Sequence, residues 1–496
     1  MRIASLLLVA VLALPLLAQH QDALTVEVVE VPVYVWRNAT PVTGLTRENF
    51  ELLVDGKPQK IDYFDVVDTG SVRVASGTRG GEVVAEDLRE RRLFLLLFDL
   101  TFSRPVAVQR AHRAAAELIE KSAPGDVYAV AVFTPTEGIR FLTPFTTDRE
   151  PVLTAVGAVR GRTTEHPMRT LVSEGSSGAA LGESRQTPDA ETAGGRSGRG
   201  PGGGGGGGRG GEIEAARAQS AAQVADLQEQ PIKRQHEMLL QDFRDTARRL
   251  APLEGQKHVV LFSEGPSIGM KSSYTLQLVE QLHHTFQEAN AFLHAVDISG
   301  LRHTFTLGEN ASLHMLASAT GGMVLQNSND LGALLTEMHE VHRYAYVLGF
   351  SPRGARRGHN AIEVKLRGVD NATVSYRRGF STDREKQSLD GLRVADILLN
   401  NIPQSGIRAS VAATPNGLRI VIPASAGLVS KDVEVMLYVF DEAKKIVESR
   451  HLLVKVEGKP RTIDAKLPLP EGRYAARVLL VAGESLGLTN TEFTVR

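Results

Sequence analysis

The spacing of hydrophobic positions changes twice along this chain. Residues 26–35 and 50–64 alternate apolar side chains with polar or small ones, and an Asp-Gly step at residues 55–56 separates two of the alternating runs. This step predicts a β-hairpin, because both residues tolerate a positive φ. From residue 93 the apolar side chains form short continuous runs, which are typical of strands buried on both faces of a parallel sheet. Alternation returns after residue 361.

The central part of the chain predicts strands that alternate with helices. Segments with helical spacing separate the apolar runs, which lie at residues 93–98, 127–133, 258–262, 291–296, 322–325 and 345–350. Such alternation predicts βαβ units with right-handed crossovers. We therefore expect an α/β fold with a doubly wound, mostly parallel sheet, flanked by N-terminal and C-terminal β-rich, sandwich-like modules.

The same changes of pattern give the expected domain boundaries. Residues 1–18 combine a basic start, a short apolar run and a small residue at the break, which indicates a secretory signal peptide. Residues 174–211 contain seven consecutive glycines at 202–208 and lack apolar periodicity, which predicts a disordered insertion. The other expected segments are an N-terminal β module at 22–68, a central α/β domain at 86–352, an appended β-hairpin at 353–382 and a C-terminal β-sandwich at 388–496.

Composition and charge exclude several functions. A formal net charge of −1 gives no basic footprint for nucleic acid. The absence of cysteine excludes disulfides, thiolate metal sites and a lipid-modified N-terminal cysteine. No stretch after the signal is long and apolar enough to span a bilayer. We therefore expect an exported protein, periplasmic or extracellular, without a transmembrane segment in its mature form.

Polar residues follow three of the predicted parallel strands. Asp99, Thr101 and Ser103 come after the first strand, Ser263 and Glu264 follow residues 258–262, and Asp297 follows residues 291–296. Ligands of open parallel sheets bind at the carboxyl ends of the strands. Carboxylates and hydroxyls are hard oxygen ligands of the kind that Mg²⁺, Ca²⁺ or Mn²⁺ takes.

The spacing Asp99-x-Thr101-x-Ser103 is similar to the Asp-x-Ser-x-Ser motif of von Willebrand factor type A domains. In that family the motif builds a metal-ion-dependent adhesion site, to which a second loop adds a threonine and a third an aspartate. The resemblance implies that Thr163 and Glu264 hold these places. Further short sequence segments resemble those of the secreted VWFA-related acidobacterial proteins. They lie at residues 41–45, 49–50, 55–57, 295–297, 319–322 and 346–350. The resemblance covers about residues 26 to 380.

Two departures from the family motif bear on the cation. Thr101 keeps the hydroxyl of the serine that it replaces. Glu264 is longer by one methylene than the family's aspartate, whereas Mg²⁺ demands near-ideal octahedral geometry. Two interpretations stay open: a degenerate site that binds Mg²⁺ or Ca²⁺, and strand-end polar residues that cap neighbouring helices.

Two other motifs suggest catalysis and are less favoured. Residues 265–269 fit Gly-x-Ser-x-Gly, with Ser267 as the nucleophile of a serine hydrolase. However, Ser263 and Glu264 separate this motif from the strand, whereas a nucleophile elbow places its serine on the sharp turn itself. His339 and His342 are three residues apart on a predicted helix, and the zinc protease motif needs four. We expect these two histidines on a solvated helix face.

The sequence therefore predicts a secreted, non-enzymatic binding protein. Its type A-like domain would engage an acidic group on a protein ligand, with or without a divalent cation. The alternative is a structural scaffold with a non-functional metal site, which binds through its β modules. A hydrolase that uses Ser267 is the third hypothesis.

Overall fold

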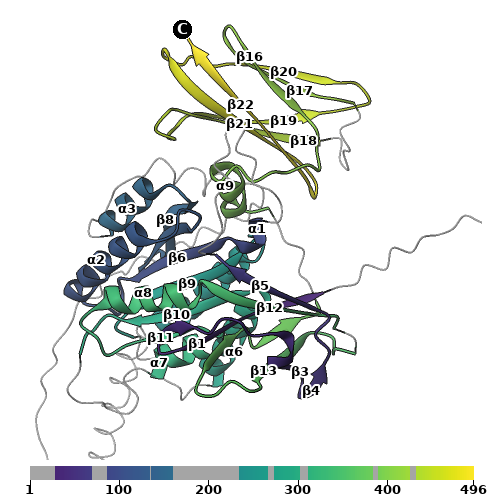
Figure 1. Ribbon diagram of the computed structural model, residues 1–496. Helices are drawn as coiled ribbons and strands as arrows, with labels where there is room; N and C mark the ends of the chain where they lie inside the picture. Colours follow the sequence, from purple (N-terminus) through teal and green to yellow (C-terminus); the bar gives the residue numbers. More distant parts are fainter. Residues whose placement is uncertain are drawn as a thin grey trace, which may run out of the picture.

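The fold combines one six-stranded, largely parallel sheet with several antiparallel sheets (Figure 1). The computed structural model describes residues 28–69, 87–134, 136–159, 234–265, 273–301, 311–352, 354–383, 389–424 and 432–496. The expected signal peptide at 1–18 and the expected insertion at 174–211 lie outside these ranges. Within them, every helix is too short or too polar to cross a bilayer.

The six-stranded sheet has the order β11-β10-β9-β6-β7-β8. Its strands are β6 (Arg92–Asp99), β7 (Val127–Thr134), β8 (Gly138–Thr146), β9 (Gln256–Ser263), β10 (Ala291–Asp297) and β11 (Val324–Leu325). All neighbours pair in parallel except β8, which forms an antiparallel hairpin with β7. The continuous apolar runs therefore form the parallel strands that they predict.

Helices cover both faces of this sheet. They are α2 (Pro105–Lys121), α3 (Arg149–Ala158), α6 (Ser273–Glu288), α7 (Ala311–Ser318), α8 (Leu331–Val341) and a helix at residues 234–250. Successive strand side chains point to opposite faces. Leu95 and Leu97 of β6 accordingly share a core with α6, α7 and residues 234–250. Phe94 and Phe98 share the other core with α2, α3 and α8. Both faces are apolar, which explains why these strands do not alternate.

The segments before and after the parallel sheet together form a second, antiparallel unit. Its elements are β1 (Val29–Arg37), β2 (Thr40–Pro41), the 3-10 helix η1 (Arg47–Asn49), β3 (Phe50–Val54), β4 (Lys57–Gln59), β5 (Tyr63–Asp68), β12 (Tyr344–Phe350), β13 (His359–Leu366), β14 (Thr373–Tyr376) and β15 (Gly379–Ser381). One sheet has the order β14-β1-β12-β5 and the other β15-β13-β3-β4, with a shared apolar core. The predicted N-terminal module and appended hairpin thus pair with each other.

The prediction that residues 345–350 belong to the parallel sheet is wrong. They form β12, which pairs antiparallel with β1 and β5. Tyr346, Leu348 and Phe350 point into the core shared with β13, and Ala345 packs toward β10 on the other side. Because β12 is covered on both faces, its apolar run is continuous like those of the parallel strands. Periodicity alone therefore does not separate the two cases.

The C-terminal part consists of one helix and two antiparallel sheets. The elements are α9 (Gly391–Leu399), β16 (Ser410–Thr414), β17 (Gly417–Ile422), β18 (Asp432–Phe440), β19 (Ile446–Lys455), β20 (Arg461–Lys466), β21 (Gly472–Ala482) and β22 (Ser485–Val495). The sheets β16-β17-β20 and β19-β18-β21-β22 enclose one apolar core. The outer face of the four-stranded sheet packs on α9 and on Leu88 of the short helix α1 (Asp87–Glu90).

Candidate functional site

Asp99 is the centre of a hydrogen-bonded site at the carboxyl end of β6. Its side chain is buried, with 1% of the residue exposed. Oδ1 accepts hydrogen bonds from the backbone N–H groups of Thr101 and Phe102, both at 2.9 Å. Oδ2 accepts from the hydroxyls of Ser103, at 3.3 Å, and Ser263, at 2.5 Å. Since β6 and β9 are parallel neighbours, their ends bring Asp99 and Ser263 together, as the sequence predicts for a strand-end site.

Ser103 links the two loops at this edge of the sheet. Its hydroxyl donates to Asp99 and accepts the backbone N–H of Glu264 at 3.1 Å. The Glu264 carboxylate itself faces Arg104, which donates its backbone N–H at 2.7 Å and its guanidinium at 2.6 Å. This ion pair is formed between a mostly exposed arginine and a glutamate whose side chain is 11% exposed. The structure thus brings Asp99, Ser103 and Glu264 into one connected network.

The hydroxyl of Thr101, unlike those of Ser103 and Ser263, does not bond to Asp99. Its Oγ1 is buried, and within the described part of the chain it has no hydrogen-bond partner. A buried polar atom without a partner costs about 1–3 kcal/mol, so native structures seldom keep one without a reason. This hydroxyl lies two residues from Asp99 on the same loop. An orphaned oxygen beside a buried carboxylate fits the donor set that a hard cation takes.

The protonation of Asp99 depends on its burial. Burial raises the pKa of this carboxyl above its ordinary value, although the four hydrogen bonds from Phe102, Ser263, Thr101 and Ser103 oppose that rise. A cation bound beside the carboxylate would favour the ionised form for the same electrostatic reason. Cation binding and proton release at Asp99 are therefore expected to be coupled.

The other predicted site residues divide into two groups. Thr163 and Ser267 lie outside the described residues, so their roles as cation ligand and nucleophile stay predictions. Asp297, the polar residue expected after the strand at residues 291–296, is the last residue of β10. There it accepts the backbone N–H and the hydroxyl of Ser299, at 2.9 and 2.5 Å.

Comparisons with known proteins give only distant likenesses. No family model matches this chain, and no curated protein does. The solved structure of the conserved hypothetical protein BatB from Bacteroides thetaiotaomicron is 8% identical with a TM-score of 0.27, and the match covers 51% of this chain and 98% of that one. A von Willebrand factor type A structure from Catenulispora acidiphila is 10% identical with a TM-score of 0.26, covering 82% of this chain and 66% of that one. TM-scores this low carry no argument about function.

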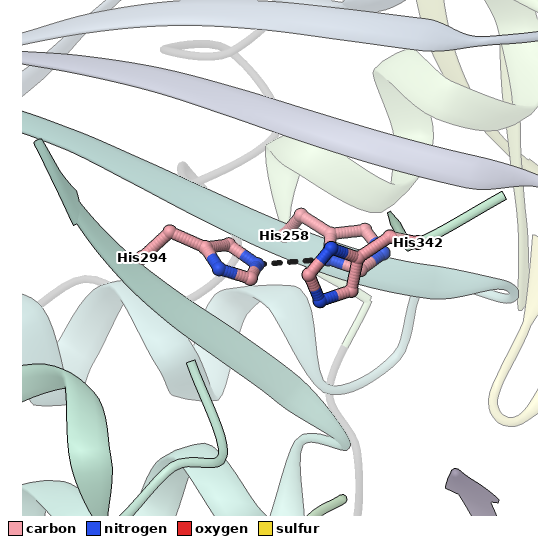
Figure 2. Close-up of side chains that lie close together, drawn as sticks. All are labelled: His258, His294 and His342. Carbon is pink, nitrogen blue, oxygen red and sulfur yellow. Dashed lines mark hydrogen bonds between the residues drawn. The ribbon is translucent and has the colours of Figure 1, made fainter. Parts of the chain in front are cut away.

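The prediction that His339 and His342 lie on a solvated helix face is wrong. Both are buried, with 7% and 0% exposed. His339 lies with its Nε2 2.7 Å from Asp126 Oδ2, and His342 joins His258 and His294 in a buried cluster (Figure 2). The sequence held a signal for this cluster, because His258 and His294 lie within or beside continuous apolar runs. A polar side chain inside such a run is buried and needs partners.

Proposed function

We propose that this chain is a secreted, non-enzymatic binding protein. In this proposal a von Willebrand factor type A-like domain presents the loops after β6 and β9 to an acidic group on a protein ligand. Asp99, Thr101 and Ser103 would hold Mg²⁺ or Ca²⁺, with Glu264 and Thr163 from neighbouring loops. The bound cation would attract the ligand's carboxylate through an open coordination position. No catalytic base is required.

The observation that supports this proposal is the convergence around Asp99. A buried carboxylate, the Ser103 and Ser263 hydroxyls and the orphaned Thr101 hydroxyl come from two loops to one edge of the sheet. Every one of these groups offers oxygen, which favours hard cations over transition metals. Helix capping alone would account for the backbone bonds to Asp99, but it would leave the Thr101 hydroxyl without a role.

The ion pair between Arg104 and Glu264 favours a second candidate, a scaffold with a non-functional metal site. The guanidinium supplies the positive charge that the glutamate would otherwise share with a cation. In the binding hypothesis, Glu264 must leave Arg104 or coordinate through water. In the scaffold hypothesis, the pair is permanent and the β sheets do the binding. The two hypotheses differ in whether millimolar cation stabilises the chain.

A thermal-shift titration with Mg²⁺, Ca²⁺ and Mn²⁺ separates these candidates. A cation that binds the folded state at ten times its Kd adds about 1.4 kcal/mol to the free energy of unfolding. Asp99→Asn should abolish this increment. Asp396→Asn is the control, because Asp396 is also a buried carboxylate but pairs with Arg91 and Asn400, away from the Asp99 network. If none of the cations shifts the wild-type melting temperature, the scaffold hypothesis replaces the first.

A further inference from the structure

Three fully buried histidines lie close together on one face of the parallel sheet. His258 lies on β9, His294 on β10, and His342 directly after α8. Each is 0% exposed. One ring nitrogen of each lies within 4.8 Å of one ring nitrogen of each other histidine. Figure 2 shows the three rings converging. Neither the strand-end site nor the proposed ligand binding uses them.

Hydrogen bonds determine which nitrogens of these rings carry protons. The backbone N–H of Met323 donates to His294 Nδ1 at 3.1 Å, so the proton of the neutral His294 ring is on Nε2. That Nε2 lies 3.0 Å from His258 Nδ1 and donates to it. His342 Nδ1 lies 2.7 Å from the carbonyl oxygen of Met338 and therefore carries a proton. These bonds require His258 and His294 to be neutral. His342 keeps its bond to Met338 in either protonation state, but its buried Nε2 has no hydrogen-bond partner in the described part of the chain.

The same tautomers argue against a metal ion in the cluster. A histidine binds a metal through a bare nitrogen, and its other nitrogen carries the proton. The bare nitrogen of His294 is already occupied by the Met323 N–H, and the nitrogen that faces His258 is protonated. Only His342, whose Nδ1–H donates to the Met338 carbonyl and whose Nε2 is bare, has the arrangement of a ligand.

Aromatic rings pack against the cluster. Rings of Phe94 and Phe292 stack on His258, with centroids 5.0 and 5.6 Å away. On β1, Tyr34 places its ring centroid 4.5 Å from that of His342 and donates its hydroxyl to Gln256 at 2.8 Å.

The charged groups that face the cluster form a separate network. Arg92 of β6 donates two hydrogen bonds of 2.8 Å to Asp126, and His339 of α8 lies against the same carboxylate. The carboxylate of Asp126 is thus already shared by two groups. A proton added to His258 or His342 would meet the positive charge of Arg92, and a proton on His294 would meet the other histidines of the cluster.

The cluster lies at the seam between the two units of the fold. Tyr34 and Ala345, from β1 and β12, pack with Phe292 of β10 and Val341 of α8 in one small apolar cluster. Trp36 of β1 packs against that cluster as well. His342 is the last residue before the chain turns from α8 toward β12. Any change that forces the three rings toward water must therefore loosen this seam.

We propose that His258, His294 and His342 form an acid-sensitive latch between the sheet of β1 and β12 and the parallel sheet. Acid would place protons on the rings, break the bonds that need neutral histidines, and open the seam to water. Burial lowers the pKa of His342 to about 3 and the pKa values of His258 and His294 well below 6.5. Because the folded-state pKa values are depressed, the latch is fully closed above about pH 6.5. It loses stability as the pH falls from there toward the folded-state values.

Trp36 is the only tryptophan in the sequence, so its fluorescence reports the seam directly. We expect its emission to shift between pH 7 and pH 5 before the far-UV circular dichroism changes. Each histidine that takes up a proton on opening should raise the opening constant about 25-fold over this range, and three should raise it about fifteen-thousand-fold. His258→Phe keeps an aromatic ring in the stack, and it should reduce the rise to about six-hundred-fold.

Two further variants keep this test decisive. His342→Gln should reduce the rise by the same factor if His258→Phe does not fold. The control is His451→Gln, because His451 is exposed on β19 and should leave the pH dependence unchanged. The latch is overturned if opening does not depend on pH between 7 and 5. It is also overturned if His258→Phe and His342→Gln keep the full pH dependence, or if the Trp36 signal moves only together with global unfolding.

Discussion

Replacing Arg92 with methionine should produce one of the largest losses of stability in this protein. The side chains of Arg92 and Asp126 are 1% and 3% exposed. Arg92 donates two bonds of 2.8 Å to the Asp126 carboxylate and one of 2.9 Å to the carbonyl of His339. Removing one partner of such a buried pair leaves an uncompensated charge and costs about 3–5 kcal/mol. That is a large share of the roughly 5–15 kcal/mol that stabilises a typical domain.

The loss should depend on pH in a direction set by His339. Burial lowers the pKa of His339, the hydrogen bond to Asp126 raises it, and the charge of Arg92 lowers it. Without Arg92, His339 becomes the cation that Asp126 needs, and its folded-state pKa rises above about 6.5. This contribution to stability is present below pH 6.5 and lost as the pH rises through the new value. The cost of Arg92→Met should therefore be smaller at pH 6 than at pH 8.

Urea unfolding followed by far-UV circular dichroism measures this cost at the two pH values. The comparison of variant with wild type at each pH removes the pH dependence that both share. The double variant Arg92→Met, Asp126→Leu is the control, because it removes both charges and should recover more than half of the lost stability. A cost of less than about 1 kcal/mol for Arg92→Met would show that the buried ion pair contributes little to stability. A cost that is equal at both pH values would refute the role given to His339.

Two further predictions concern the site and the sheet edge. Arg104→Gln should increase cation affinity several-fold in a calorimetric titration, because Glu264 loses the guanidinium that neutralises it; unchanged affinity would show that Glu264 takes no part. Gly322→Ala should destabilise the protein by more than about 2 kcal/mol in thermal unfolding, because a Cβ there would lie 1.9 Å from the carbonyl oxygen of Leu293. Gly157→Ala in α3 is its control, since nothing lies within 4 Å of the added Cβ and alanine favours helices. Equal effects of the two glycine variants would contradict this account of Gly322.

The sequence was sufficient to predict five of the strands in the six-stranded sheet and the polar residues that follow them, but it wrongly added residues 345–350 to that sheet. Continuous apolar runs mark burial on both faces, and the carboxyl ends of adjacent parallel strands must lie at one edge, so Asp99 and Glu264 were expected in one place. The pairing of β1 with β12 was not predictable in the same way, because it joins residues about 300 positions apart and depends on the register of the whole fold.

The ion pair of Arg104 and the burial of His342 also escaped prediction, for different reasons. Arg104 immediately follows the Asp99 motif, but nothing in the motif shows which way a long side chain turns. His342 has helical spacing from His339, and that spacing indicates one helix face without saying whether the face meets water. His342 is buried because β1 packs against the parallel sheet and the end of α8, and this long-range contact is visible only in the structure.

The proposed function requires that the loops after β6 and β9 hold a divalent cation beside Asp99. The most direct measurement is a titration of Mn²⁺ into the full chain, with free Mn²⁺ followed by electron paramagnetic resonance. We predict one site of millimolar or tighter affinity, from which Mg²⁺ or Ca²⁺ displaces Mn²⁺. Asp99→Asn should abolish this site, and Asp396→Asn should leave it in place. Absence of bound Mn²⁺ in the wild type, or equal binding by Asp99→Asn, would contradict it.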